Sequence, residues 1–293
     1  MAVKLSILFV INMNNFINIL QYQFVERALI AGLFLGVLCA ILGVFLVLRK
    51  MSLIGDGLAH ISFGAIAIGL LFGIYPFIVA IPLVILASLI IYALTRNHII
   101  EGDAIIGILA SLGLSTGVIL SSISTGFNID IFSYLFGNIL SITQSELIFV
   151  IIGSTIIISI IVLFYQEFMY ISFNPEQAKI SGLSVTILDI IFSILTALTV
   201  IMSIKLAGAL LVSALIILPA SSSLQISRSF RTTILISIII AILSIILGII
   251  VSFIINIPTG ATVVVINAIF FFGILITKII LKRYKLTLPN RDI

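Results

Sequence analysis

The sequence predicts an all-α, polytopic transmembrane helical bundle, and its composition and hydropathy pattern both point to this class. Of the 293 residues, 62% are hydrophobic and 8% are charged, and the mean hydropathy is +1.45. Soluble domains carry about 25% charged residues, so this chain has too few polar side chains for a water-facing surface. Its repeated apolar runs, each about 20 residues long, match spanning helices rather than the short alternating strands of a membrane barrel.

The first 26 residues are predicted to form an N-terminal extracellular or interfacial leader. Lys4 precedes a short apolar run, and an asparagine-rich stretch follows it. No small-residue cleavage site is present there, so the segment does not read as a cleaved signal peptide.

Residues 27–283 are expected to form the transmembrane permease domain, and residues 284–293 a cytoplasmic tail. Polar links, proline–glycine turns and basic clusters divide the apolar sequence into nine candidate spans. A model with eight spans and one re-entrant segment is the alternative. The expected spans are approximately 28–48, 57–73, 77–95, 104–124, 146–165, 185–204, 206–224, 234–255 and 261–281.

The distribution of lysine and arginine orients these spans, because cytoplasmic loops carry the excess of positive charge. With nine spans, three of the basic residues fall on one side, namely Lys4, Arg27 and Lys205. All the others fall on the side of the link at residue 50: Arg49, Lys50, Arg96, Lys179, Arg228, Arg231, Lys278, Lys282, Arg283, Lys285 and Arg291. The N-terminus is therefore expected outside and the C-terminus in the cytoplasm.

The longest polar interval, residues 166–184, contains a predicted two-turn helix on the cytoplasmic side. Asn174 can cap a helix whose first residue is Pro175, with Glu176 in the first turn and Gly182 as its stop. A plain connecting loop is the alternative interpretation.

The stretch Gly55-Asp56-Gly57-Leu58-Ala59-His60 carries the candidate metal ligands. A carboxylate and an imidazole are costly in a membrane segment, and a spacing of four places both on one helix face. Together they suit Zn²⁺ or Mn²⁺. The alternative is that Asp56 is a helix N-cap and His60 an interfacial side chain.

Several function classes lack their sequence signals. There is no phosphate-binding Gly-x-x-x-x-Gly-Lys-Ser/Thr loop and no His-Glu-x-x-His motif, so we expect neither ATP hydrolysis nor another enzymatic activity in this chain. No basic patch with interleaved aromatic residues suggests nucleic-acid binding. The single cysteine, Cys39, excludes a disulfide framework. A bundle that passes a small cation, with its energy supplied by another protein, fits what is present.

Four stretches, taken together, resemble the metal-type ABC importer permeases, the membrane subunits for zinc, manganese or ferrous iron uptake. They are residues 47–64, 174–182, 205–220 and 257–260, and the resemblance runs in colinear order from about residue 21 to residue 281. The form Gly-Asp-x-Leu-Ala-His is closest to the zinc members. The resemblance therefore implies a type II ABC importer-like fold in a bacterial cell membrane.

What this resemblance implies is a homodimer with two cytoplasmic ABC ATPase subunits and an extracellular metal-binding lipoprotein. Asp56 and His60 would be the ligands of the ion in transit, Zn²⁺ or alternatively Mn²⁺ or Fe²⁺, with no permanently bound cofactor. Glu176, Lys179 and Gly182 fall in the stretch that matches the family's docking helix for the ATPase. A metal carrier driven by an ion gradient is the alternative from another class.

Overall fold

The computed structural model describes residues 22–96, 100–123, 134–135, 137, 142–209 and 211–287, and within these ranges every assigned element is helical. Residues 1–21 of the predicted leader and residues 288–293 of the predicted tail lie outside the described residues. In chain order the helices are α2 (Gln23–Leu48), α3 (Ile54–Leu71), α4 (Pro76–Arg96), α5 (Gly102–Ile123), α7 (Gln144–Leu163), α8 (Tyr165–Phe173), α9 (Pro175–Ile180), α10 (Val185–Ala207), α11 (Val212–Ile226), α12 (Phe230–Ile255) and α13 (Thr259–Thr287).

In the described part of the chain, eight helices are long and apolar enough to cross a membrane. This count matches the eight-span alternative, because the expected span over residues 206–224 is interrupted. Helix α10 continues to Ala207, Gly208 follows with a φ of 81°, and α11 begins only at Val212. With 15 residues and a proline at position 219, α11 is shorter than the other apolar helices.

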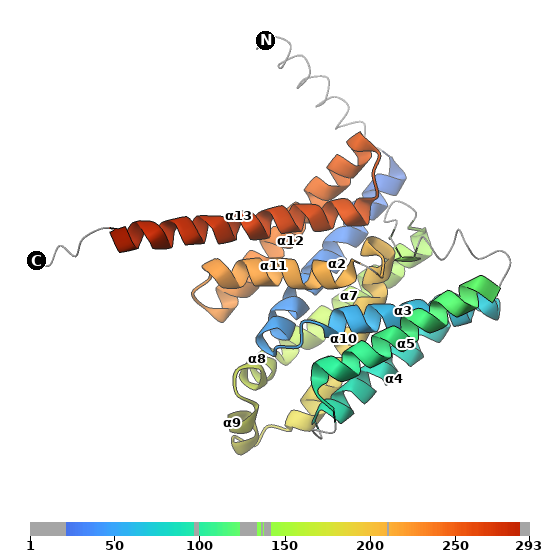
Figure 1. Cartoon of the computed structure of the whole chain (residues 1–293), viewed down its shortest axis with the longest axis horizontal. Helices are drawn as coiled ribbons and strands as arrows, with labels where there is room; N and C mark the ends of the chain where they lie inside the picture. Colours follow the sequence, from blue (N-terminus) through green and yellow to red (C-terminus); the bar gives the residue numbers. More distant parts are fainter. Residues whose placement is uncertain are drawn as a thin grey trace, which may run out of the picture.

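Helix α2 lies at the centre of the bundle and packs against α7, α10, α11 and α12 (Figure 1). In its most apolar 18-residue window, 72% of the residues are buried. Close approach depends on glycine here: a Cβ at Gly43 would lie 3.0 Å from the carbonyl carbon of Ile216 and 3.3 Å from the Cβ of Ala220. Small residues thus bring α2 and α11 together, as is typical of membrane helix interfaces.

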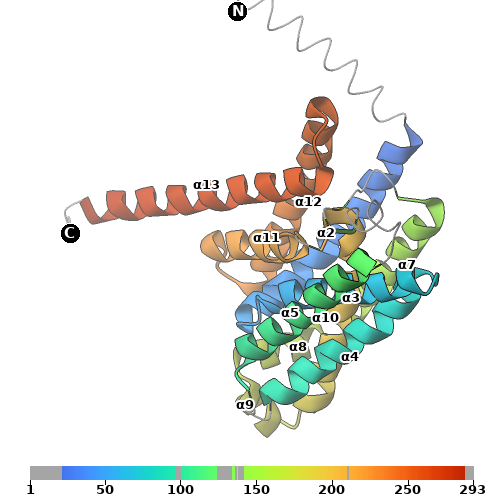
Figure 2. The same ribbon diagram turned by 45° about the vertical axis from the view of Figure 1, so that its right-hand side comes forward.

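Helices α3, α4 and α5 form a second group beside this centre, and α13 extends away from the body of the bundle toward the C-terminus (Figures 1 and 2). In α5 the glycines and the hydroxyl side chains face different surroundings. Gly113 and Gly117 pack against α3, whereas Ser111, Thr116 and Ser122 are exposed. Each of these three hydroxyls donates a hydrogen bond to a carbonyl of its own helix.

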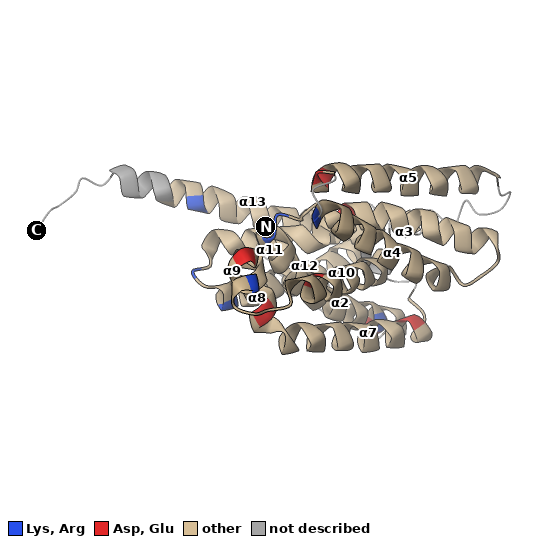
Figure 3. Ribbon diagram, turned by 90° about the horizontal axis from the view of Figure 1, so that it is seen from below, with Lys and Arg blue, Asp and Glu red and all other residues tan. Residues whose placement is uncertain are grey.

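Charged side chains lie mainly at helix ends, and a group of them surrounds α8, α9 and the link between α11 and α12 (Figure 3). Arg228 and Arg231 belong to that link and to the start of α12, and Glu176 and Lys179 belong to α9. The long helices between these ends are almost free of charge among the described residues, which suits a hydrocarbon environment.

Candidate metal site and coupling segment

Asp56 and His60 lie on one face at the start of α3. Asp56 is the third residue of the helix, and the Nε2 atom of His60 is 3.6 Å from its Oδ2 atom. The predicted pairing of the two side chains is therefore present. The alternative role of Asp56 as N-cap is wrong, because Leu53 occupies the N-cap position and no side chain caps this helix.

The separation of these two atoms is close to what a shared metal ion requires. Zinc bonds to nitrogen and oxygen ligands are about 2.1 Å long, so two ligands at tetrahedral angles lie about 3.4 Å apart. The observed 3.6 Å needs only a small adjustment. The two side chains also differ in solvent exposure, since that of Asp56 is 45% exposed and that of His60 is 17% exposed. The carboxylate is thus the more accessible of the two candidate ligands.

Backbone packing against α5 holds His60 in place. A Cβ at Gly113 would lie 2.7 Å from the carbonyl oxygen of His60 and 2.5 Å from the Cα of Ile61. The Nδ1 atom of His60 is buried and has no hydrogen-bond partner among the described residues. Metal-ligating histidines usually gain their orientation from a bond at the second ring nitrogen. Here the main chain at His60 and Ile61 packs against Gly113 of α5, which fixes the position of this part of α3.

A third helix reaches the site, and the sequence pattern did not predict it. Ser213, in the first turn of α11, donates a long hydrogen bond of 3.5 Å to the Oδ1 atom of Asp56. The start of α3 and the start of α11 lie close together, and a Cβ at Gly55 would be in van der Waals contact with the Cα of Ser213, at 3.6 Å. Ser213 is 157 residues from Asp56, so no local spacing rule could have paired them.

One chain brings two ligands together at this place. Within the residues that the structure describes, no group of three or more histidine, cysteine, aspartate or glutamate side chains could hold a metal ion. Zinc prefers four ligands, and an ion in transit also has to leave. The pair is therefore an incomplete coordination set.

The predicted short helix is present as α9. The Asn174 side chain accepts a hydrogen bond from the amide of Gln177, and Pro175 is the first helical residue. At the other end the amide of Gly182 donates to the carbonyl of Lys179, and the amide of Leu183 to that of Ala178. These two bonds form a Schellman motif, which requires the left-handed φ of 85° observed at Gly182. The interpretation of this stretch as a plain loop is therefore wrong.

The outer surface of α9 is open. Glu176, Lys179 and Gly182 are exposed, and Ala178 is the buried residue of the helix. Ile180, which the sequence analysis did not single out, is 85% exposed. An isoleucine this exposed stands out on a short, capped and otherwise polar helix, because apolar side chains with polar surroundings are typical of interface anchors.

Comparisons with known proteins agree with this arrangement. Residues 21–278 match the ABC 3 transport family. The chain is 33% identical over 209 residues to the high-affinity zinc uptake system membrane protein ZnuB of Haemophilus influenzae, covering 71% of this chain and 80% of that protein. It is also 33% identical over 255 residues to the manganese transport system membrane protein MntC of Listeria monocytogenes, covering 87% and 91%.

The fold is also found in a solved complex. The chain aligns with a chain of PsaBC from Streptococcus pneumoniae in complex with Fab, with a TM-score of 0.81 and 29% identity. The alignment covers 89% of this chain and 95% of that one. The family match spans most of the sequence, including the Asp56–His60 pair and α9. This chain belongs to the ABC 3 transport family.

Proposed function

We propose that this chain is the membrane permease subunit of an ABC importer that passes a divalent metal ion, Zn²⁺, into the cytoplasm. The observation that carries the proposal is the Asp56–His60 pair at the start of α3, with its ligand atoms 3.6 Å apart. An intramembrane carboxylate and imidazole at that distance suit a borderline divalent cation. Energy comes from separate ABC ATPase subunits, and an extracellular metal-binding lipoprotein delivers the ion.

A second copy of the chain supplies the other half of the site. Each copy contributes one oxygen and one nitrogen ligand, so a homodimer provides the four ligands of a tetrahedral zinc site. Because each copy holds the ion with two ligands, a relative movement of the copies opens the site without breaking a complete shell in one chain. This supports both binding and release, which transport requires.

Manganese is the second candidate cargo. The Listeria monocytogenes relative is named a manganese transport protein, and its identity to this chain equals that of the zinc relative. Mn²⁺ favours oxygen-rich, higher-coordinate sites, whereas a set of two carboxylates and two imidazoles with four-fold geometry favours Zn²⁺. We infer zinc from this ligand chemistry.

The proposal is tested with the complete transporter, reconstituted in vesicles with its ATPase and binding protein. We expect ATP-dependent accumulation of radioactive Zn²⁺, and growth rescue by added Zn²⁺ in a strain lacking this chain. Accumulation of Mn²⁺ in place of Zn²⁺ would overturn the choice of metal. Uptake by the chain alone, driven by an ion gradient without ATP, would overturn the ABC importer proposal.

We further propose that α9 is the docking helix for the ATPase, with Glu176, Lys179 and Gly182 at the contact. Replacing Gly182 by alanine puts a side chain at a left-handed residue, which costs about 1 kcal/mol and loosens the end of α9. We therefore expect Gly182→Ala and Glu176→Ala each to lower the number of ions transported per ATP hydrolysed. Both quantities are measured in the reconstituted complex.

A matched control for Glu176→Ala removes an exposed carboxylate from the opposite end of the bundle. Glu26 lies in the first turn of α2, at the opposite end of that helix from the link to α3. We expect Glu26→Ala to leave coupling unchanged. Wild-type coupling in both α9 variants would refute the docking assignment.

A further inference from the structure

Arg49 is a buried cation directly after α2, and the proposed function so far gives it no role. Its side chain is 9% exposed. Its Nη1 atom donates to the Oδ1 atom of Asp189 at 2.8 Å, and its Nε atom donates to the Oγ atom of Ser172 at 3.0 Å. The guanidinium group lies over the ring of Phe192, 4.1 Å from its centre. Three interactions thus converge on one side chain.

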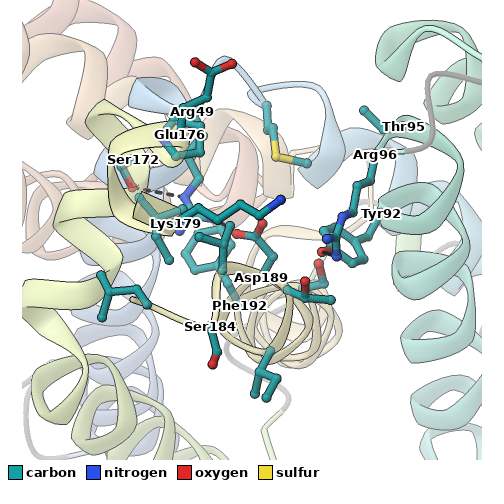
Figure 4. A pocket seen from close by; sticks show the side chains of 18 of the residues that line it. Arg49, Tyr92, Thr95, Arg96, Ser172, Glu176, Lys179, Ser184, Asp189 and Phe192 are labelled. Atoms are coloured by element: carbon teal, nitrogen blue, oxygen red, sulfur yellow. Dashed lines mark hydrogen bonds and ion pairs between the residues drawn. The ribbon is translucent and has the colours of Figure 1, made fainter. Parts of the chain in front are cut away.

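The partners of Arg49 lie on either side of α9 in the sequence. Ser172 is on α8, two residues before the Asn174 cap of α9. Asp189 and Phe192 are in the first two turns of α10, the next helix after α9. Arg49 therefore ties together the chain segment that enters α9 and the segment that leaves it. Figure 4 shows this arrangement, with the Arg49–Ser172 bond drawn as a dashed line.

Helix α9 contacts α8 and α10 and buries Ala178, and on another side it faces open space. A cavity of about 960 Å³ lies between α9, the segment after α2 and the end of α4. Glu176 and Lys179 line it on the α9 side, and Tyr92 and Arg96 line it on the α4 side (Figure 4). Close packing is what transmits displacement between elements, and this cavity separates α9 from the end of α4, so the contacts of α9 with α8 and α10 carry its displacement.

The segment from Arg49 to Asp56 is short and internally bonded. The amide of Met51 donates to the carbonyl of Leu46 at 2.9 Å, and the amide of Ile54 donates to that of Met51 at 3.2 Å. These bonds join the end of α2 to the start of α3, which lies five residues after Arg49. A shift of Arg49 is therefore carried into the first turn of α3, where Asp56 lies.

We propose that Arg49 is the positioning residue that couples movement of α9 to the Asp56–His60 pair. A displacement of α9 moves Ser172 and the start of α10. Because both are bonded to Arg49, Arg49 moves with them. The short link after Arg49 then rotates the first turn of α3. This inference rests on the proposed function, because it needs an ATPase that moves α9 and an ion that the pair holds.

Arginine suits this task better than lysine would. Its planar guanidinium directs several donors at fixed angles, so one side chain bonds Ser172 and Asp189 at once while stacking on Phe192. A lysine ammonium is a compact point charge and cannot keep all three contacts. Arg49→Lys therefore retains the positive charge beside Asp189 and removes the guanidinium group that bonds two partners at once. The variant thus distinguishes a coupling role from simple neutralisation of a buried carboxylate.

The experiment compares Arg49→Lys with wild type in the reconstituted transporter, measuring Zn²⁺ uptake, ATP hydrolysis and Zn²⁺ binding in parallel. We expect uptake per ATP hydrolysed to fall about tenfold, because the compact ammonium of lysine cannot keep the bonds to both Ser172 and Asp189. Zn²⁺ bound per permease in the absence of ATP stays at the wild-type level, because Asp56 and His60 remain. Ser172→Ala, which removes one of the two acceptors, gives a smaller loss in the same direction and covers the case in which Arg49→Lys does not assemble.

Arg96→Lys is the matched control, because Arg96 lines the same cavity but bonds the Tyr92 hydroxyl within its own helix. It should transport like wild type. If Arg49→Lys and Ser172→Ala both transport as many ions per ATP hydrolysed as wild type, the inference is overturned while the proposed function stays intact. The same holds if Arg49→Lys loses bound Zn²⁺ in the same proportion as it loses uptake. A wild-type transporter that moves no metal would instead overturn the proposed function.

Discussion

Replacing His60 by alanine is expected to abolish metal uptake while the protein stays folded and assembled in its complex. In the proposed site His60 supplies the nitrogen ligand of each copy, and its removal leaves a carboxylate that is 45% exposed and readily hydrated. Loss of a supporting partner alone costs a metal site about 10- to 100-fold in affinity, so loss of a ligand is expected to exceed that range. The same result is expected for Asp56→Ala. Uptake of radioactive Zn²⁺ and the amount of assembled complex are the measurements.

The sequence offers a control for this pair, since it contains one other histidine, His98. His98→Ala tests whether loss of any histidine lowers uptake, and we expect wild-type transport. Full transport by both Asp56→Ala and His60→Ala would show that the pair does not carry the ion.

Gly113→Ala is expected to lower uptake about tenfold and to destabilise the protein by about 1–3 kcal/mol, the usual cost of an overpacked interface. Its added methyl group would lie 2.5 Å from the Cα of Ile61 and 2.7 Å from the carbonyl oxygen of His60. Both are backbone atoms, so α5 has to move away from α3. The main chain at His60 then shifts, and its side chain shifts with it. Thermal unfolding in detergent and uptake per assembled complex measure the two effects.

Gly107→Ala is the matched control, because Gly107 lies on the same helix and a Cβ there meets no atom within 4 Å. Alanine is also the better helix former, so this variant should be as stable as wild type or slightly more stable. A Gly113→Ala variant that behaves like Gly107→Ala would show that the contact between α3 and α5 does not position His60.

Local features of the sequence predicted the parts of the site that lie within one helix. The spacing of four between Asp56 and His60 placed both on one face, and Asn174, Pro175 and Gly182 predicted α9 through its capping chemistry. These predictions worked because caps and i, i+4 pairs depend on the nearest few residues. The family resemblance, carried by the same stretches, was confirmed by the match over residues 21–278.

Long-range contacts could not be predicted in the same way. Arg49 meets Asp189 across 140 positions and Ser213 meets Asp56 across 157, and hydropathy says nothing about which polar groups meet. The N-cap role of Asp56 was a wrong local choice, because the helix begins two residues before it without a side-chain cap. The structure matches the eight-span alternative rather than nine spans in the described residues, because the chain breaks at Gly208 and α11 has only 15 residues.

The exposed hydroxyls of α5 have a consequence for whatever lies against that face. Ser111, Thr116 and Ser122 each give their proton to a carbonyl of their own helix, so the oxygen lone pairs are what they offer outward. Because the hydroxyl protons are already bonded within the helix, this surface needs no hydrogen-bond acceptor from its surroundings. Lipid or a second copy can therefore lie against it without leaving a hydroxyl donor unsatisfied. The same lone pairs attract positive charge and the protons of its hydration shell. This face of α5 is therefore compatible with contact to hydrocarbon and also offers acceptor atoms to a hydrated cation.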